Sequence, residues 1–200
     1  QLGDHVVRGV YGGAIPDLSD IGTVIVEPVQ GRGGIRVPPA GWLQELADRT
    51  RAAGAVLVFD EVYTGFGRTG SWFAFQHEDV RPDVLVLGKG MAGGFPISAC
   101  IGTADAMDAW GASQGEALHT QTFLGNPVGC AMALACIQEL ETIIPNIQDK
   151  CRWLAGELSR RGYVTRGRGM MLGIEIPNAL GVSRSLLRQG FIALPAGETA

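Results

Sequence analysis

The pattern of hydrophobic positions in the first half of the chain predicts strands that alternate with helices. Apolar runs at residues 21–27, 55–59, 84–87 and 97–102 are typical of buried strands. Between the first two runs, residues 40–53 place apolar side chains at helical spacing, so a helix is expected there. A strand, a helix and a strand in such a short stretch form a βαβ unit, which indicates a mostly parallel sheet with right-handed crossovers.

The second half of the chain predicts a long helix followed by a smaller α+β region. Residues 127–141 are typical of an apolar helix packed deep in the protein, and residues 146–161 of a separate amphipathic helix after Pro145. The other expected elements are short helices at 104–110 and 182–189 and strands at 163–165, 170–176 and 190–194. We therefore predict an α/β fold, in which residues 1–142 form part of a large domain with a mostly parallel sheet, flanking helices and the linking helix, and residues 143–200 form part of a small α+β C-terminal domain.

Composition and charge narrow the classes of function. The chain has 200 residues, 46% of them hydrophobic, and a net charge of −4 without a basic patch, which argues against nucleic acid as the main partner. No apolar run approaches the roughly 20 residues of a membrane span and no signal peptide opens the chain, so we expect a cytoplasmic protein without a membrane partner. The histidines are far apart and form no metal-ligand pattern. The cysteines lack metal-site spacing and are expected to be reduced and buried; they are Cys100, Cys130, Cys136 and Cys151.

Three of the predicted strands are followed at once by ionisable residues. Glu27 and Asp60 come directly after apolar runs, and Lys89 follows the next run after a single glycine. Because ligands of open parallel sheets bind outside the carboxyl ends of the strands, we expect two carboxylates and an amine on one rim of the sheet. Asp60 should be partly buried and would need a cationic partner or hydrogen bonds. The alternative is that a strand-end acid such as Glu27 only caps a helix or pairs with an arginine.

Lys89 is one of only two lysines in the chain and lies in the glycine-rich segment GKGMAGG. We expect it to have little access to bulk water, and a desolvated lysine, unlike an arginine, can form an imine with an aldehyde. We therefore interpret Lys89 as the carrier of an aldehyde cofactor, with an ordinary strand-end lysine as the alternative. Asp60 would then pair with a positive ring nitrogen, as an acid does in pyridoxal phosphate enzymes.

A cofactor phosphate would need hydroxyls and backbone amides at a turn or a helix N-terminus. The segment TQTFLGNP, residues 120–127, offers the hydroxyl of Thr122 directly before the long predicted helix. Asn126 and Pro127 are also expected to begin that helix, as its cap and its first residue.

Four segments together resemble the class III pyridoxal-phosphate aminotransferases, which have fold type I. They are EPVQGRGG (27–34), FDEVYTGFGRTG (59–70), PDVLVLGKGMAGGFPISA (82–99) and HTQTFLGNPVGCAMALA (119–135), in family order and at family spacing. The resemblance implies a transaminase that moves an amino group from an amino acid or ω-amine donor to a 2-oxo acid, with pyridoxal 5′-phosphate as cofactor. It also implies a homodimer with shared active sites, and we expect the chain to be an incomplete part of a longer enzyme.

The resemblance implies a role for each matching residue. Lys89 would bind the cofactor as an imine and later carry the proton at the substrate Cα. Asp60 would bind the pyridine nitrogen, Val62 would pack on one face of the ring, and Glu27 would belong to the hydrogen-bond surroundings of both. Thr122 would reach the cofactor phosphate of the neighbouring subunit.

Two positions depart from the family pattern. Tyr63 stands where the family usually has a Gln that contacts the 3-hydroxyl of the cofactor, and its phenol is expected to keep that contact. Arg32 stands where members that handle ornithine or γ-aminobutyrate often have a Glu that pairs with a switch arginine. Arg32 cannot form that pair, and we interpret it as a ligand of a substrate carboxylate. Arg68 is interpreted as structural or interfacial.

Three other interpretations stay open. The same cofactor residues would serve an aminomutase, a racemase or a decarboxylase. The loops GKGMAGG and GFGRTG could belong to a nucleotide-binding module, although no Ser or Thr follows Lys89 as in a Walker loop and neither loop opens a clear helix as a GxGxxG motif should. A cofactor-free structural subunit is disfavoured by the presence of both Lys89 and Asp60, because a buried unpaired charge is costly.

Overall fold

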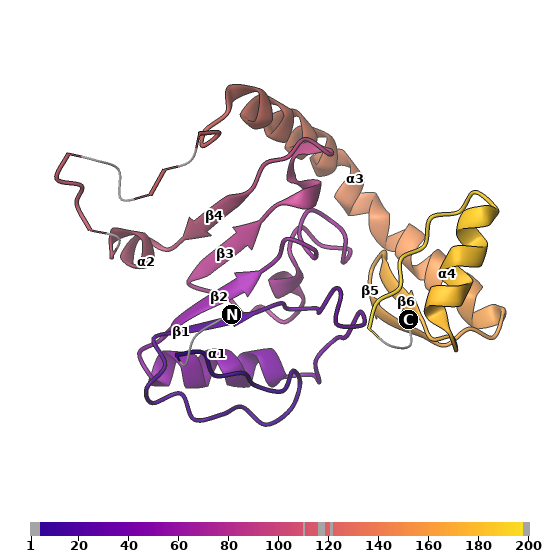
Figure 1. Ribbon diagram of the computed structural model, residues 1–200, viewed down its shortest axis with the longest axis horizontal. Helices are drawn as coiled ribbons and strands as arrows, with labels where there is room; N and C mark the ends of the chain where they lie inside the picture. Colours follow the sequence, from indigo (N-terminus) through magenta and orange to yellow (C-terminus); the bar gives the residue numbers. More distant parts are fainter. Residues whose placement is uncertain (1–4, 110, 116–118, 121, 198–200) are drawn as a thin grey trace.

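The computed structural model describes residues 5–109, 111–115, 119–120 and 122–197 (Figure 1). Its central feature is a four-stranded sheet in the order β1-β2-β3-β4. These strands are β1 (Thr23–Val26), β2 (Val56–Asp60), β3 (Val84–Leu87) and β4 (Ala99–Gly102). β1, β2 and β3 are parallel, whereas β4 runs antiparallel to β3. The predicted α/β fold with a mostly parallel sheet is confirmed.

Helix α1 (Trp42–Ala52) covers one face of the sheet and builds the main core with it (Figure 1). Its buried residues Leu43 and Ala47 pack against Leu57 and Phe59 of β2, and Phe59 is completely buried. Burial of such a side chain contributes about 1.5–3 kcal/mol. The carboxyl end of β2 is therefore held firmly, which matters because a predicted site residue lies there.

β1 is an edge strand of the described sheet, not the buried strand expected for residues 21–27. Its residues alternate in exposure along the strand, and Ile25 is 70% exposed. The expectation was wrong because a continuous apolar run does not reveal whether a strand is covered on one side or on both.

Three short elements connect the longer ones: η1 (Ala74–His77), η2 (Lys89–Ala92) and α2 (Ala104–Asp108). The predicted short helix at residues 104–110 is thereby found as α2.

Among the four cysteines, all of which are free, only Cys151 is buried, whereas Cys100 and Cys130 are exposed. The expectation that all four are buried was wrong, because an apolar neighbourhood in sequence does not ensure cover in space.

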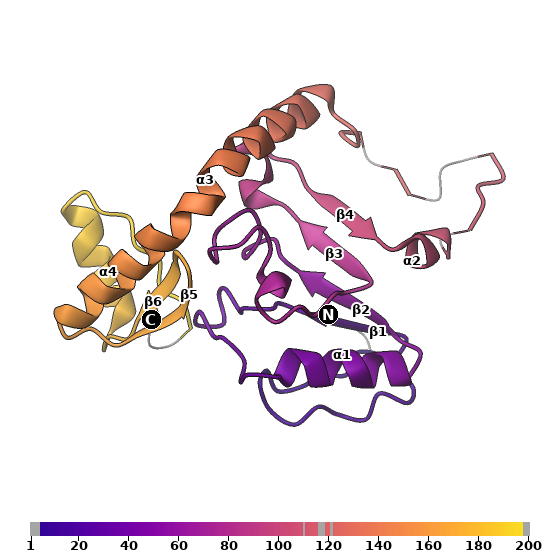
Figure 2. The ribbon, with the colours of Figure 1, turned by 180° about the vertical axis from the view of Figure 1, so that it is seen from behind.

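The long helix α3 (Pro127–Arg160) runs from the central sheet to a second, two-stranded sheet (Figure 2). It is one continuous helix, so the prediction of two helices separated at Pro145 was wrong. The loop that follows β2 contacts α3 on both sides of the proline. A Cβ on Gly67 would lie 3.0 Å from Ile144 Cγ1, and Gln148 donates a hydrogen bond to a carbonyl of the same loop. These contacts stabilise the helix where the proline removes a backbone donor.

The first half of α3 is largely exposed, contrary to the expectation of deep packing. Val128, Met132 and Leu134 are exposed, whereas Gly129 and Ala133 are buried. In the part of the chain that the structure describes, α3 alone is long and apolar enough to cross a membrane, a test that the core helix of a soluble protein also passes. This differs from the expectation that no apolar segment approaches that length.

The second sheet is an antiparallel hairpin with one helix beside it (Figure 2). Its elements are β5 (Thr165–Arg168), β6 (Met171–Ile174) and α4 (Ala179–Arg188). Residues 191–196 form no strand, so the strand predicted at 190–194 was wrong; β5 and β6 pair only with each other among the described residues. The predicted domain division between residues 142 and 143 falls inside α3.

The turn of this hairpin contacts the loop that follows β2. Met170 N and Met171 N both donate hydrogen bonds to Arg68 O, at 3.0 and 3.2 Å. The backbone of Gly169 lies so close to that of Thr69 that a Cβ on the glycine would be 2.2 Å from the threonine carbonyl carbon. The second sheet is therefore joined to the same loop that leaves the predicted site.

Candidate functional site

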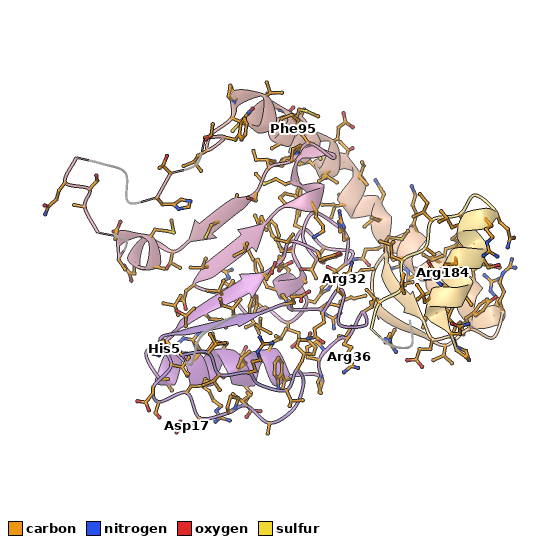
Figure 3. The ribbon with its side chains drawn as sticks, in the orientation of Figure 1. His5, Asp17, Arg32, Arg36, Phe95 and Arg184 are labelled. Atoms are coloured by element: carbon orange, nitrogen blue, oxygen red, sulfur yellow. The ribbon has the colours of Figure 1, made fainter. Side chains whose placement is uncertain are left out.

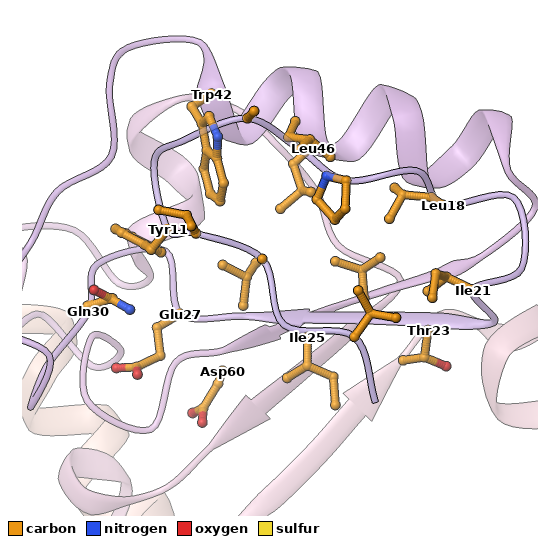
Figure 4. A pocket seen from close by; sticks show the side chains of 18 residues that line it. Tyr11, Leu18, Ile21, Thr23, Ile25, Glu27, Gln30, Trp42, Leu46 and Asp60 are labelled. Atoms are coloured by element: carbon orange, nitrogen blue, oxygen red, sulfur yellow. The ribbon is translucent and has the colours of Figure 1, made fainter. Parts of the chain in front are cut away.

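Glu27 and Asp60 face the same cavity at the carboxyl ends of β1 and β2 (Figure 4). The cavity has a volume of about 370 Å³. Tyr11 and Gln30 line the same end as the two carboxylates, and apolar side chains line most of the remainder. The predicted placement of two carboxylates on one rim of the sheet is confirmed.

The two carboxylates differ in their hydrogen bonds. Glu27 Oε2 accepts a hydrogen bond from Gly31 N at 2.8 Å, which closes the turn after β1. Asp60 Oδ1 accepts a hydrogen bond from Val62 N at 3.0 Å, and Asp60 Oδ2 has no such partner within the described ranges. Asp60 is half-buried, as predicted. Its second oxygen is therefore an acceptor available to a cationic group in the cavity.

Lys89 begins η2 just beyond the end of β3. Its backbone has a φ of 42°, in the left-handed region, which costs of order 1–3 kcal/mol for a residue with a side chain and is concentrated at functional sites. Its Nζ lies 3.6 Å from the centroid of the Tyr63 ring, a cation–π contact. The lysine is exposed, so the expectation that it has little access to water was wrong. The flanking glycines have no side chains with which to cover it.

The Tyr63 ring contacts both Lys89 and the turn that follows β1. A Cβ on Gly31 would lie 3.0 Å from Tyr63 Cγ, closer than an ordinary van der Waals contact, so the ring can lie flat only against a residue without a side chain. Val62 packs beside Gly88, where a Cβ would lie 3.5 Å from Val62 Cγ1. The segment after β2 thus places two predicted cofactor residues, Val62 and Tyr63, against the turn that carries the lysine.

Tyr63 also lines a second cavity, of about 610 Å³, together with Arg32 and Arg68. Most of the other lining residues are apolar and come from β6, α4 and residues 193–196. Arg32 is exposed, and Figure 3 shows it where the central sheet approaches the second sheet. The structure therefore places a guanidinium beside apolar space, next to Tyr63.

Glu61 is a buried acid next to Asp60 for which the sequence analysis gave no role. It is fully buried, and its carboxylate accepts three hydrogen bonds, from Ala74 N at 2.6 Å, from Phe75 N at 2.9 Å and from Thr64 Oγ1 at 2.8 Å. Burial raises the pKa of Glu61, and the hydrogen bonds oppose that rise. A usable signal was the pair of adjacent acids at a strand end, since neighbouring side chains in an extended strand point in opposite directions.

Thr122 lies in the exposed segment that leads into α3. Neither the cavity lined by Asp60 nor the cavity lined by Tyr63 includes it. Asn126 caps α3 as predicted, because its Oδ1 accepts hydrogen bonds from Val128 N at 3.0 Å and Gly129 N at 3.1 Å. The structure thus brings Glu27 and Asp60 together at one cavity, whereas neither Lys89 nor Thr122 lines that cavity or the one beside Tyr63.

The arrangement suits an aldehyde that carries a cationic ring. Lys89 supplies an exposed amine that forms a cation–π contact with the Tyr63 ring. Asp60 supplies a half-buried carboxylate with one available oxygen. Among the residues that the structure describes, no group of three or more His, Cys, Asp or Glu side chains could hold a metal ion. The ionisable groups that the rim offers are an amine and two carboxylates.

Comparison with known families gives one match that covers most of the chain. The model of the family "Aminotransferase class-III" matches residues 17–200. Among curated proteins, the acetylornithine aminotransferase of Methanopyrus kandleri is 43% identical over 162 residues, which cover 78% of this chain and 41% of that protein. The acetylornithine aminotransferase of Streptomyces coelicolor is 42% identical over 164 residues, covering 78% and 40%. The chain spans about two fifths of the length of these relatives.

Solved structures agree on the fold. The adenosylmethionine-8-amino-7-oxononanoate aminotransferase of Methanocaldococcus jannaschii superimposes with a TM-score of 0.79 at 31% identity, covering 88% of this chain and 47% of that chain. An (S)-enantioselective ω-transaminase from Thermomicrobium roseum gives 0.78 at 32% identity, covering 86% and 44%. The ornithine aminotransferase of Toxoplasma gondii, described with partial occupancy of PLP at its active site, gives 0.75 at 35% identity, covering 88% and 43%.

Proposed function

The chain belongs to the class III aminotransferases, and from this membership we propose that the protein is a transaminase that uses pyridoxal 5′-phosphate. It would move an amino group from an amino acid or ω-amine donor to a 2-oxo acid. The single observation that supports this most strongly is the placement of the exposed Lys89 amine and the available oxygen of Asp60 at the carboxyl ends of adjacent parallel strands.

The residues present fit this cofactor. Asp60 has one oxygen without a protein partner in the described chain and faces the cavity at the strand ends. Lys89 lies just beyond the end of the neighbouring strand β3, in which Val86 is in register with Asp60. When bound, pyridoxal phosphate supplies an electron-accepting ring and an aldehyde that condenses with amines.

The proposed roles of the residues follow from what each can offer. Lys89 Nζ would hold the aldehyde covalently and, once released from it, would move a proton to and from the substrate Cα. Asp60 would keep the pyridine nitrogen protonated through a charge-assisted hydrogen bond, and Glu27 would hold the neighbouring turn in place through Gly31 N. Val62 would pack against one face of the ring.

Tyr63 is proposed to contact the 3-hydroxyl of the cofactor from its position below Lys89 Nζ. A phenol is both a donor and an acceptor, so it can replace an amide in this contact. Gly31 meets the ring at Cγ and the two Cδ atoms. This supports the proposal, because the hydroxyl is at the opposite end of the ring.

Thr122 and the subunit arrangement are proposed together. Thr122 lines neither cavity of the rim in its own chain, which suits a role at the cofactor phosphate of a second copy. The exposed apolar residues at the start of α3, such as Leu124, Val128 and Leu134, support a homodimer in which this region is covered.

We also propose a cytoplasmic location and a division of the chain into part of a large domain, residues 1–142, and part of a small C-terminal domain, residues 143–200.

The substrate class is proposed from the relatives and from Arg32. Relatives are named as aminotransferases of acetylornithine and of ornithine, and one solved structure as an ω-transaminase. Arg32 lines the cavity beside Tyr63 and is proposed to bind a substrate carboxylate there. A guanidinium holds a carboxylate with two parallel hydrogen bonds, so Arg32 would favour donors or acceptors with a second acidic group.

The proposal is tested by amino transfer to a 2-oxo acid in Asp60→Asn protein. Loss of a hydrogen bond to a charged group costs about 1.5–3 kcal/mol, so turnover should fall by about 10- to 150-fold. The matched control is Asp48→Asn, because Asp48 is exposed on α1 and pairs only with neighbours on that helix. Unchanged turnover in Asp60→Asn would exclude the proposed role. Products other than an amino acid from the acceptor would instead point to another pyridoxal phosphate reaction.

A further inference from the structure

Glu61 is a fully buried acid that the proposed chemistry does not use. It directly follows Asp60, the last residue of β2, yet the two side chains have different surroundings. Asp60 lines the cavity at the rim. Glu61 instead contacts the segment that follows β2, where Thr64 of the loop and the first two residues of η1 supply its three hydrogen-bond donors.

The carboxylate of Glu61 caps the short helix η1 from a distance in sequence. Its Oε2 accepts hydrogen bonds from Ala74 N at 2.6 Å and from Thr64 Oγ1 at 2.8 Å, and its Oε1 accepts one from Phe75 N at 2.9 Å. Amides in the first turn of a helix have no partner within the helix, so they need an acceptor from elsewhere. Glu61 supplies it from 13 and 14 residues upstream.

These hydrogen bonds close residues 62–73 into a loop that is fixed at both ends. The loop contains Val62 and Tyr63, which pack against the Lys89 turn. The backbone of Glu61 serves the sheet separately, because Glu61 N donates a hydrogen bond to Val86 O at 2.9 Å. A change confined to the Glu61 side chain should therefore loosen the two ends of the loop, near Val62 and Ala74, and leave both the strand and the contacts of Arg68 and Gly70 in place.

We propose that Glu61 is a positioning residue that holds Val62 and Tyr63 in place for the reaction at Lys89, a role that rests on the proposed function. Three donors converge on its two oxygens, and a carboxylate is the only side-chain group of this size that has acceptors alone. The NH₂ group of a glutamine at this position would face a backbone N–H donor and could not accept its hydrogen bond. An aspartate is one methylene shorter and would reach less far.

The test compares Glu61→Gln with Glu45→Gln in the purified protein without added cofactor. Glu45 is exposed on α1, where it forms only an ion pair with Arg49. Hydrogen exchange of the amides of Ala74 and Phe75 should accelerate by about 10- to 150-fold in Glu61→Gln, as expected for loss of a hydrogen bond to a charged acceptor. It should be unchanged in Glu45→Gln.

A second readout follows the position of Tyr63 through the reactivity of Lys89. N-hydroxysuccinimidyl acetate labels lysines, and Lys150, the other lysine of the chain, is an exposed internal reference. The Tyr63 ring lies 3.6 Å from Lys89 Nζ and covers it on one side, so release of the ring should raise the ratio of labelling at Lys89 to that at Lys150 by about two- to fivefold. An unchanged ratio together with unchanged exchange at residues 74 and 75 would overturn the proposal.

Thr64→Val and Thr64→Ser keep the proposal testable if Glu61→Gln does not fold. Thr64→Val removes one donor to Glu61 and should raise both readouts partially, whereas Thr64→Ser keeps the hydroxyl and should leave them near those of the unchanged protein. Equal behaviour of the two variants would overturn the proposal.

Pyridoxal phosphate binding is then measured separately, because failure of the unchanged protein to bind it would refute the proposed function and not the role of Glu61 in holding the loop.

Discussion

Replacement of Gly169 by alanine should separate the second sheet from the loop that leaves the site. Gly169 has a φ of 64°, a left-handed conformation that costs an alanine about 1–2 kcal/mol. The new Cβ would also lie 2.2 Å from the carbonyl carbon of Thr69 and 2.6 Å from Gly70 N, both backbone atoms that no side-chain rotation can move away. Carbon atoms in contact lie about 3.5–4 Å apart, so the hairpin would have to move by roughly 1 Å or more.

That movement would break the two hydrogen bonds that Met170 N and Met171 N donate to Arg68 O. Each contributes about 0.5–1.5 kcal/mol, so with the backbone cost the free energy of unfolding should fall by about 2–5 kcal/mol in Gly169→Ala. Gly190→Ala is the matched control, because Gly190 has a φ of 86° and no atom within 4 Å of its missing Cβ. It should lose only the conformational part, about 1–2 kcal/mol.

Equilibrium unfolding in urea measures both variants against the unchanged protein, with hydrogen exchange at the Met170 amide as a local readout. The amide should exchange faster in Gly169→Ala and at its original rate in Gly190→Ala. Equal losses of stability in the two variants would refute the reasoning, because they would show that the contact between hairpin and loop contributes nothing.

Two further predictions concern Tyr63 and His77. Tyr63→Leu should raise the labelling of Lys89 by about two- to fivefold, as expected for loss of an exposed cation–π contact, whereas Tyr63→Phe keeps the ring and should leave the labelling unchanged; equal labelling in both variants would contradict the contact. Burial, and then the nearby Arg168, lower the pKa of His77 from its ordinary value of 6.5. The folded protein then binds fewer protons than the unfolded chain, so Tm should fall as the pH decreases from about 6.5 through the lowered pKa. In His77→Gln this slope should be absent, and an unchanged slope would mean that another group causes it.

Much of the central sheet could be predicted because its evidence is local in sequence. The apolar runs at 55–59 and 84–87 and the helical pattern at 40–53 each correspond to an element found in the structure. The placement of Glu27 and Asp60 at one cavity could be predicted from one rule of topology, because neighbouring parallel strands end on the same side of a sheet.

The features that could not be predicted depend on partners far away in the sequence. Pro145 predicts a break in a helix, but contacts from the loop after β2 stabilise α3 on both sides of it. Lys89 was expected to be shielded from water, yet exposure depends on what packs beside a turn, and glycines provide no cover. The role of Glu61 needed the position of η1, which no periodicity places next to the end of β2.

The central claim is that Lys89 is the residue that binds pyridoxal phosphate covalently. The protein is incubated with pyridoxal phosphate, reduced with sodium borohydride, digested and mapped by mass spectrometry. Because the chain contains only Lys89 and Lys150, the exposed Lys150 serves as a built-in measure of non-specific reaction. The account predicts that the reduced cofactor is found on Lys89 at equimolar cofactor, with little or none on Lys150. Equal modification of both lysines, or modification of Lys150 alone, would contradict it.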